Sequence, residues 1–181
     1  MEIKGKQILV VGLGRSGVGA ALLCAARGGR VTATDSRPAH ALAHAVASLQ
    51  GHCELELGGH VLESFTNSEL IVLSPGVPEI PPLLAARERG VQVMGELELS
   101  YRLVQAPVVA ITGTNGKSTT TSLIGAMVEA SGRPTFTGGN LGAPLVEAVG
   151  TPAAGPDGAL VVETSSFQLE TVETFHARVA L

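Results

Sequence analysis

The chain has 181 residues, of which 45% are hydrophobic and 15% charged, and its formal net charge is −4. This length suits one large domain or two small ones, and the apolar content excludes intrinsic disorder. Only 3% of the residues are aromatic and there is no basic excess. The chain therefore lacks the charges and stacking side chains of nucleic-acid-binding proteins, and we expect no nucleic-acid partner.

The expected location is the cytoplasm, and we expect a soluble monomer. No apolar run approaches the roughly 18 residues that a membrane span needs. The apolar stretch near the N-terminus is interrupted by Arg15 and is too short for a signal peptide. Cys24 and Cys53 have no metal-ligand spacing, and we interpret them as two buried thiols in a reducing compartment.

Short β-branched runs alternate with Ala- and Leu-rich segments in the first half of the chain. Such runs are typical of strands buried on both faces of a parallel sheet. The predicted strands are Gln7–Val11, Arg30–Thr34, Leu70–Leu73 and Val91–Met94, and the predicted helices are Ser16–Arg27, Ala39–Leu49 and Pro81–Arg89. The alternation predicts an α/β fold, with a Rossmann-like parallel-sheet domain over residues 1–95.

The pattern restarts in the second half of the chain. The predicted order is a connecting helix, a strand, a long helix and a second strand: Glu96–Val104, Val108–Ile111, Lys117–Ala130 and Ala159–Val162. We predict a second domain over residues 96–181, an incomplete P-loop-type α/β domain. Residues 178–181 read as the first half of another strand, so we expect the chain to be the front part of a longer protein.

A glycine-rich turn, Gly12-Leu13-Gly14-Arg15-Ser16-Gly17, follows the first predicted strand, and Asp35 closes the second. The glycines permit a tight turn, and the N-terminus of the next helix attracts an anion. Asp35 can accept hydrogen bonds from a ribose or a base. This context favours a nucleotide site over a turn without a ligand, and alone it would indicate NAD.

A second loop, residues 112–119 (TGTNGKST), joins a predicted strand to a predicted helix. Its backbone N–H groups would hold phosphates, Lys117 would reach the β- and γ-phosphates, and Ser118 would ligate Mg²⁺. Ile111 stands where the longer pattern GxxxxGK[ST] has glycine, so the match is to the shorter GxxGK[ST]. The alternative is a capped helix with a surface lysine, but the strand–loop–helix context favours ATP binding. The predicted ATP-binding residues are Gly113, Thr114, Asn115, Gly116, Lys117, Ser118 and Thr119.

Two further motifs offer polar groups. Glu163 comes at the carboxyl end of a predicted strand, where a carboxylate can hold Mg²⁺. Equally, the loop after it would cap a helix through Ser165 or Ser166, and the residues leave both interpretations open. Asn140, in the glycine-rich segment 138–142, would donate to an anionic ligand, although by itself this segment reads as a simple turn.

Six motifs occur together: GLGRSG (12–17), LSPGVP (73–78), GELEL (95–99), TGTNGKST (112–119), GGNLG (138–142) and ETSSFQLE (163–170). In this order the sequence resembles the Mur ligases of peptidoglycan synthesis, particularly the branch that adds D-glutamate to UDP-N-acetylmuramoyl-L-alanine. The resemblance covers essentially the whole chain. It implies an ATP- and Mg²⁺-dependent, ADP-forming ligase that makes an amide bond through an acyl phosphate.

The resemblance also implies roles for individual residues. Lys117 would be catalytic, and Ser118 and Glu163 would ligate magnesium. Asn140, Ser165 and Gln168 would contact the muramoyl side of the substrate or its pyrophosphate. D-glutamate would bind mostly on a further domain, so we expect these 181 residues alone to bind the UDP substrate and to form no amide. The residues implied around the UDP group are Gly14, Arg15, Ser16, Asp35, Ser36, Arg37, Ser74, Pro75 and Gly76.

Three alternatives remain open from the sequence. An NAD-dependent dehydrogenase would explain the first turn but not the second. Another amide ligase of the same superfamily, such as a folylpolyglutamate synthase, would carry the ATP loop nearer to its N-terminus. A nucleotide-sensing module without catalysis is the third.

Overall fold

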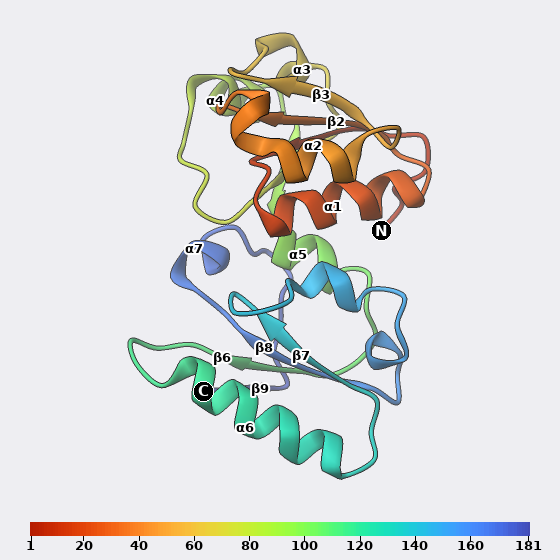
Figure 1. The fold of residues 1–181 in the computed structure, drawn as a ribbon, viewed down its shortest axis with the longest axis vertical. Helices are drawn as coiled ribbons and strands as arrows, with labels where there is room; N and C mark the ends of the chain where they lie inside the picture. The colour runs from red at the N-terminus through yellow and green to blue at the C-terminus, as the bar shows by residue number, and fades with distance from the viewer. The chain divides into compact units, whose positions relative to one another are not determined.

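The computed structural model describes residues 1–181, which form two compact units, residues 1–96 and 97–181. Each unit is built on a parallel β-sheet with helices packed against it (Figure 1). The predicted α/β class is therefore confirmed for both halves of the chain. No helix has the length and apolar character that crossing a membrane requires.

The first sheet has five parallel strands in the order β3-β2-β1-β4-β5. The chain starts at the central strand, adds strands outward on one side, and then returns to the other side. The carboxyl ends of β1 and β4 therefore lie at a topological switch point, where open α/β sheets bind ligands. The strands are β1 (Gln7–Val11), β2 (Arg30–Asp35), β3 (Glu54–Leu57), β4 (Leu70–Leu73) and β5 (Gln92–Gly95).

Successive side chains of β1 point to opposite faces of the sheet, and Ile8 to Val11 are all apolar and buried. Both faces of this sheet are therefore covered by helices. Leu9 and Val11 pack with Phe65 and Leu83, which come from α3 and α4. The other face is covered by α1, together with α2 in Figure 1. The helices are α1 (Arg15–Ala26), α2 (Ala43–Leu49), α3 (Leu62–Thr66) and α4 (Pro81–Glu88), with a 3₁₀ turn, η1 (Ala39–Leu42), before α2.

The second sheet has four parallel strands in the order β7-β8-β6-β9. One face carries the long helix α6 (Lys117–Ala130), and the other packs against α5 (Glu96–Tyr101) and two 3₁₀ turns, η2 (Leu145–Ala148) and η3 (Pro152–Ala154). The strands are β6 (Val108–Ile111), β7 (Thr135–Gly139), β8 (Ala159–Glu163) and β9 (Val179–Ala180), and a short helix, α7 (Ser166–Leu169), follows β8.

Several elements differ from the prediction. The helix predicted over residues 39–49 begins as a 3₁₀ turn, and the helix predicted over 96–104 ends at Tyr101. Gly138 and Gly139, expected in a turn, instead end β7. Both cysteines are free thiols, but only Cys24 is fully buried, and Cys53 is half-buried. Burial raises the pKa of Cys24 to about 12, so this thiol stays protonated.

Candidate functional site

A pocket of about 380 Å³ lies at the carboxyl edge of the first sheet. This volume falls within the usual range of small-molecule sites. Arg15 and Ser16 begin α1 and do not line the pocket. The pocket brings together seven of the residues predicted around a UDP group, Gly14, Asp35, Ser36, Arg37, Ser74, Pro75 and Gly76.

The glycine-rich turn beside this pocket is shaped by close packing. Gly12 has a φ of +85°, a conformation that favours glycine. A Cβ on Gly17 would lie only 1.9 Å from the carbonyl oxygen of Gly12. Gly14 is the N-cap of α1 and supplies no side-chain cap, so the first N–H groups of the helix can bind an anion.

Asp35 is held by four hydrogen bonds. Its Oδ1 accepts from the backbone N–H of Arg37 at 2.9 Å and from Nε of Arg37 at 3.0 Å. Its Oδ2 accepts from the N–H of Leu13 at 2.8 Å and from Nη2 of Arg37 at 2.7 Å. The side-chain hydrogen bond from Arg37 is the main cause that lowers the pKa of Asp35 to about 2. Asp35 therefore ties the glycine turn to Arg37 at the edge of the pocket.

The sequence analysis missed His60, which also lines this pocket. Its position three residues after β3 could have indicated this, because the carboxyl ends of parallel strands lie at one edge of a sheet, where the pocket is. However, β3 has the sequence Glu-Leu-Glu-Leu at the border of the sheet. It lacks the continuous apolar run by which the central strands were identified.

A second pocket, of about 580 Å³, lies at the carboxyl edge of the second sheet. Gly113 and Gly116 in its loop have φ values of +122° and +78°, which lets the chain turn tightly into α6. Lys117 points back over the loop, and its Nζ donates to the carbonyl oxygen of Gly113 at 2.8 Å. The lining residues are Thr112, Gly113, Thr114, Lys117, Asn140, Thr164, Ser165, Ser166 and Phe167.

Three predicted residues meet at the base of this loop. The hydroxyl of Ser118 donates to Oε2 of Glu163 at 2.7 Å, and Nδ2 of Asn140 donates to Oε1 at 3.0 Å. The backbone N–H of Asn140 also donates to the carbonyl oxygen of Glu163 at 2.8 Å. Glu163 ends β8 and is 2% exposed. A hydroxyl and a carboxylate at this distance form the kind of oxygen donor set that Mg²⁺ prefers.

The interpretation of Ser165 as a helix cap is confirmed. Its Oγ accepts from the N–H of Gln168, and the side-chain oxygen of Gln168 accepts from the N–H of Ser165 at 3.0 Å. This reciprocal capping box holds the start of α7 against the pocket. Gln168 is only 2% exposed, so in this structure its carbonyl oxygen serves the cap.

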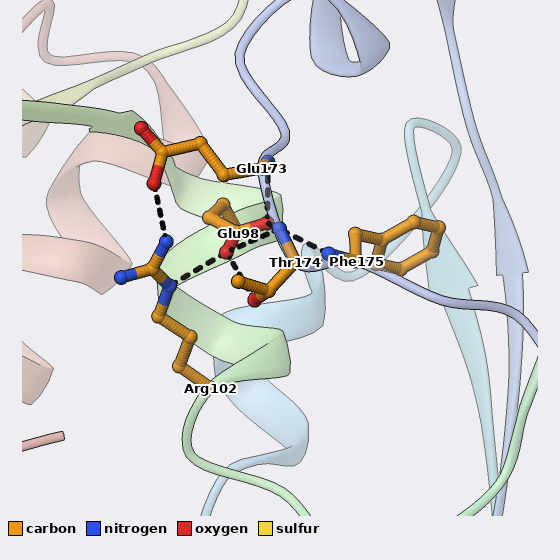
Figure 2. A network of polar contacts seen from close by, with 5 residues as sticks. All are labelled: Glu98, Arg102, Glu173, Thr174 and Phe175. Atoms are coloured by element: carbon orange, nitrogen blue, oxygen red, sulfur yellow. Dashed lines mark hydrogen bonds and ion pairs between the residues drawn. The ribbon is translucent and has the colours of Figure 1, made fainter.

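A buried carboxylate anchors the far end of the segment that follows α7 (Figure 2). Glu98 is fully buried and accepts the backbone N–H groups of Glu173, Thr174 and Phe175. It also accepts from Nε of Arg102 at 2.6 Å. Burial alone would raise the pKa of Glu98, but the hydrogen bonds from Thr174 and Arg102 outweigh it and lower the pKa to about 2. The motif GELEL gave no indication of this contact, because its partners lie more than 70 residues away.

Comparisons with known families match both halves of the chain. A model described as "Mur ligase MurD-like, N-terminal domain" matches residues 6–95, and one described as "Mur ligase middle domain" matches residues 111–179. The matches fall in the two units that the structure separates.

Two curated relatives are named UDP-N-acetylmuramoylalanine–D-glutamate ligase. The chain is 56% identical over 183 residues to that of Anaeromyxobacter dehalogenans, covering 99% of this chain and 38% of the relative. It is 51% identical over 185 residues to that of Desulfatibacillum aliphaticivorans, covering 100% of this chain and 40% of the relative. The chain thus spans about two fifths of the length of these relatives.

A solved murein peptide ligase from Psychrobacter arcticus shares the fold. Its TM-score is 0.61 at 17% identity, over 97% of this chain and 42% of that one.

Proposed function

Because the chain belongs to the Mur ligase family, we propose that the protein joins D-glutamate to UDP-N-acetylmuramoyl-L-alanine at the expense of ATP. The names of relatives at 56% and 51% identity support this substrate pair within the family. The observation that carries the proposal is the contact of Ser118 with Glu163 beneath the loop that holds Lys117. We propose a cytoplasmic location, where ATP is available, and a monomer.

The proposed reaction begins with a carboxylate, which is a poor acyl donor because oxide is a poor leaving group. Transfer of the γ-phosphoryl group of ATP to the alanyl carboxylate gives an acyl phosphate and ADP. The amine of D-glutamate then attacks the acyl carbon, phosphate leaves with the electron pair of the broken bond, and the amine loses a proton. The protein must hold two anionic reactants together and stabilise the charge on the transferring oxygens.

The second pocket supplies groups for phosphoryl transfer. Lys117 would exchange the carbonyl oxygen of Gly113 for phosphate oxygens, and the N–H groups of the loop would bind the same anion. Ser118 and Glu163 would hold Mg²⁺, which neutralises charge on the phosphates when it is bound. The remaining residues predicted to bind ATP, Gly113, Thr114, Asn115, Gly116 and Thr119, belong to the loop or to the first turn of α6.

The first pocket would hold the UDP group. Its diphosphate would lie at the N-terminus of α1, and Ser36, Arg37 and Ser74 would contact the nucleoside. Asp35 would act through Arg37, since its acceptor positions are filled. A dinucleotide site of the NAD type needs an acidic side chain free to bind the ribose, so this geometry disfavours the dehydrogenase alternative.

The proposal is tested in the full-length protein by ADP formation with both UDP-N-acetylmuramoyl-L-alanine and D-glutamate present. Lys117→Ala should lower this rate by roughly 10²- to 10³-fold, as for the loss of one group that stabilises transition-state charge. Binding of the UDP substrate, measured by calorimetry, should be unchanged.

Lys4→Ala, at an exposed position of the first unit, is the matched control and should retain full activity. Continued ADP formation over many turnovers without D-glutamate would contradict the proposed reaction, in which only one equivalent of ADP forms before the amine attacks. Loss of substrate binding together with activity in Lys117→Ala would show that the loop is a structural element only.

A further inference from the structure

His60 has no role in the function proposed so far. It lies three residues beyond β3, at the same edge as Asp35 at the end of β2. It lines the first pocket together with Ser36, Arg37 and Ser74. An imidazole in this place can contact a bound nucleoside directly.

Two contacts fix the ring of His60. Its Nδ1 lies 3.0 Å from Oγ1 of Thr34, a fully buried residue of β2. Its ring meets that of Phe65 edge-on, with the two centroids 5.7 Å apart. With Nδ1 turned toward Thr34, Nε2 is the ring nitrogen left for a ligand.

One tautomer of His60 satisfies both contacts of the Thr34 hydroxyl. This hydroxyl also lies 3.3 Å from the carbonyl oxygen of Gly59. A carbonyl can only accept, so both contacts are hydrogen bonds at once only when Thr34 donates its single proton to Gly59. Oγ1 of Thr34 then accepts from Nδ1–H of His60, and Nε2 keeps a free lone pair.

The sheet geometry relates this lone pair to one part of UDP. β3 is two strands away from β1 in the sheet, and neighbouring strands lie about 4.8 Å apart. The end of β3 is therefore about 10 Å from the glycine turn after β1. With the diphosphate at that turn, the base, which is the part of UDP farthest from the diphosphate, would reach His60.

We propose that Nε2 of His60 accepts a hydrogen bond from N3–H of uracil and so selects uridine over cytidine nucleotides. Uracil carries a proton at N3, whereas the N3 of cytosine is an acceptor and would face a second lone pair. The oxygens of Asp35 already accept hydrogen bonds from Leu13 and Arg37, whereas Nε2 of His60 has no hydrogen bond within the protein that competes for this role. The inference rests on the proposed function, since it takes the first pocket to be the UDP site.

The test compares UDP and CDP binding to the full-length protein by calorimetry. His60→Phe keeps a ring against Phe65 and removes both nitrogens. We expect it to weaken UDP binding roughly 3- to 10-fold, the effect of one lost hydrogen bond, and to leave CDP binding unchanged or tighter, because no lone pair then faces N3 of cytosine. His44→Phe makes the same exchange at an exposed position of α2 and should alter neither affinity.

Two further measurements keep the outcome clear. His60→Gln, whose amide can donate or accept, should bind UDP and CDP about equally, and it replaces His60→Phe if that variant does not fold. 3-Methyluridine 5′-diphosphate, which lacks the N3 proton, should bind the unaltered protein as weakly as UDP binds His60→Phe. An unchanged UDP-to-CDP ratio in a folded variant overturns the role of His60, whereas failure of the unaltered protein to bind UDP overturns the proposed function.

Discussion

Gly17 and Gly14 belong to one motif but differ in what a side chain would meet. A Cβ at Gly17 would overlap the carbonyl oxygen of Gly12 at 1.9 Å, whereas at Gly14 the nearest atom would be Oγ of Ser74 at 3.6 Å. We therefore predict that Gly17→Ala lowers the free energy of unfolding by about 1–3 kcal/mol, because the turn and α1 must move apart. Urea denaturation measures this change.

Gly14→Ala is the control for this substitution, since Gly14 has a φ of −75° that alanine adopts. Gly14→Ala should lower the free energy of unfolding by less than half as much as Gly17→Ala. Equal losses in the two variants would show that the close approach of Gly17 to Gly12 does not limit the fold.

At the scale of single residues, the sequence predicted where a residue lies along the fold better than which side chains it contacts. Glycine spacing placed the turn after β1, and the loop pattern placed Lys117 and Ser118 at the start of α6, because these signals are local. The pairing of Asp35 with Arg37 and the position of His60 depend on side-chain rotamers and on the path of an edge strand. Neither leaves a periodic signal in the sequence.

Glu98 links helix α5 to the segment 173–175, because its carboxylate accepts hydrogen bonds from three successive backbone N–H groups. Glu98→Gln would remove the negative charge and replace one acceptor oxygen by an NH₂ group, which cannot accept a hydrogen bond from the N–H groups of residues 173–175. We predict a loss of about 2–4 kcal/mol in the free energy of unfolding, since buried donors would be left unpaired. Chemical denaturation of the variant measures it.

Glu173→Gln provides the comparison at the rim of the same network. Its carboxylate contacts Nη2 of Arg102 at 2.6 Å, but its side chain is 57% exposed. An exposed ion pair contributes about 1 kcal/mol or less. Equal losses in both variants would refute the view that the buried carboxylate holds this segment.

At the scale of elements, long buried strands and long helices were predicted, and short or marginal ones were not. β7 has the sequence Thr-Phe-Thr-Gly-Gly, in which the glycines suggested a turn. A Cβ at Gly139 would lie 2.3 Å from the carbonyl oxygen of Glu163. The glycine is thus required by close strand packing, which becomes visible only once β7 is placed beside β8.

Each of the two units contains one carboxylate whose pKa lies well below its ordinary value. The pKa of Asp35 falls from 3.8 to about 2, and that of Glu98 from 4.5 to about 2. Both groups bind a proton more readily in the unfolded chain, so their contributions are present above about pH 4.5 and are lost as the pH falls toward 2.

We therefore predict that acid weakens both units, and that each carboxylate loses on the order of 1–2 kcal/mol of its contribution between pH 6 and pH 3. Urea denaturation at pH 6 and pH 3 would measure the loss. Asp35→Asn and Glu98→Gln should each start from a lower stability and lose less on acidification. A variant that keeps the full acid dependence would exclude its carboxylate as the cause.

The reciprocal hydrogen bonds of Ser165 and Gln168 make one wall of the second pocket depend on a pair of side chains acting together. Altering either partner would release the first turn of α7, with Ser166 and Phe167, which line that pocket. Weakened affinity after a change at Gln168 would then report a displaced wall, even though this glutamine is almost wholly enclosed and need never touch the bound molecule.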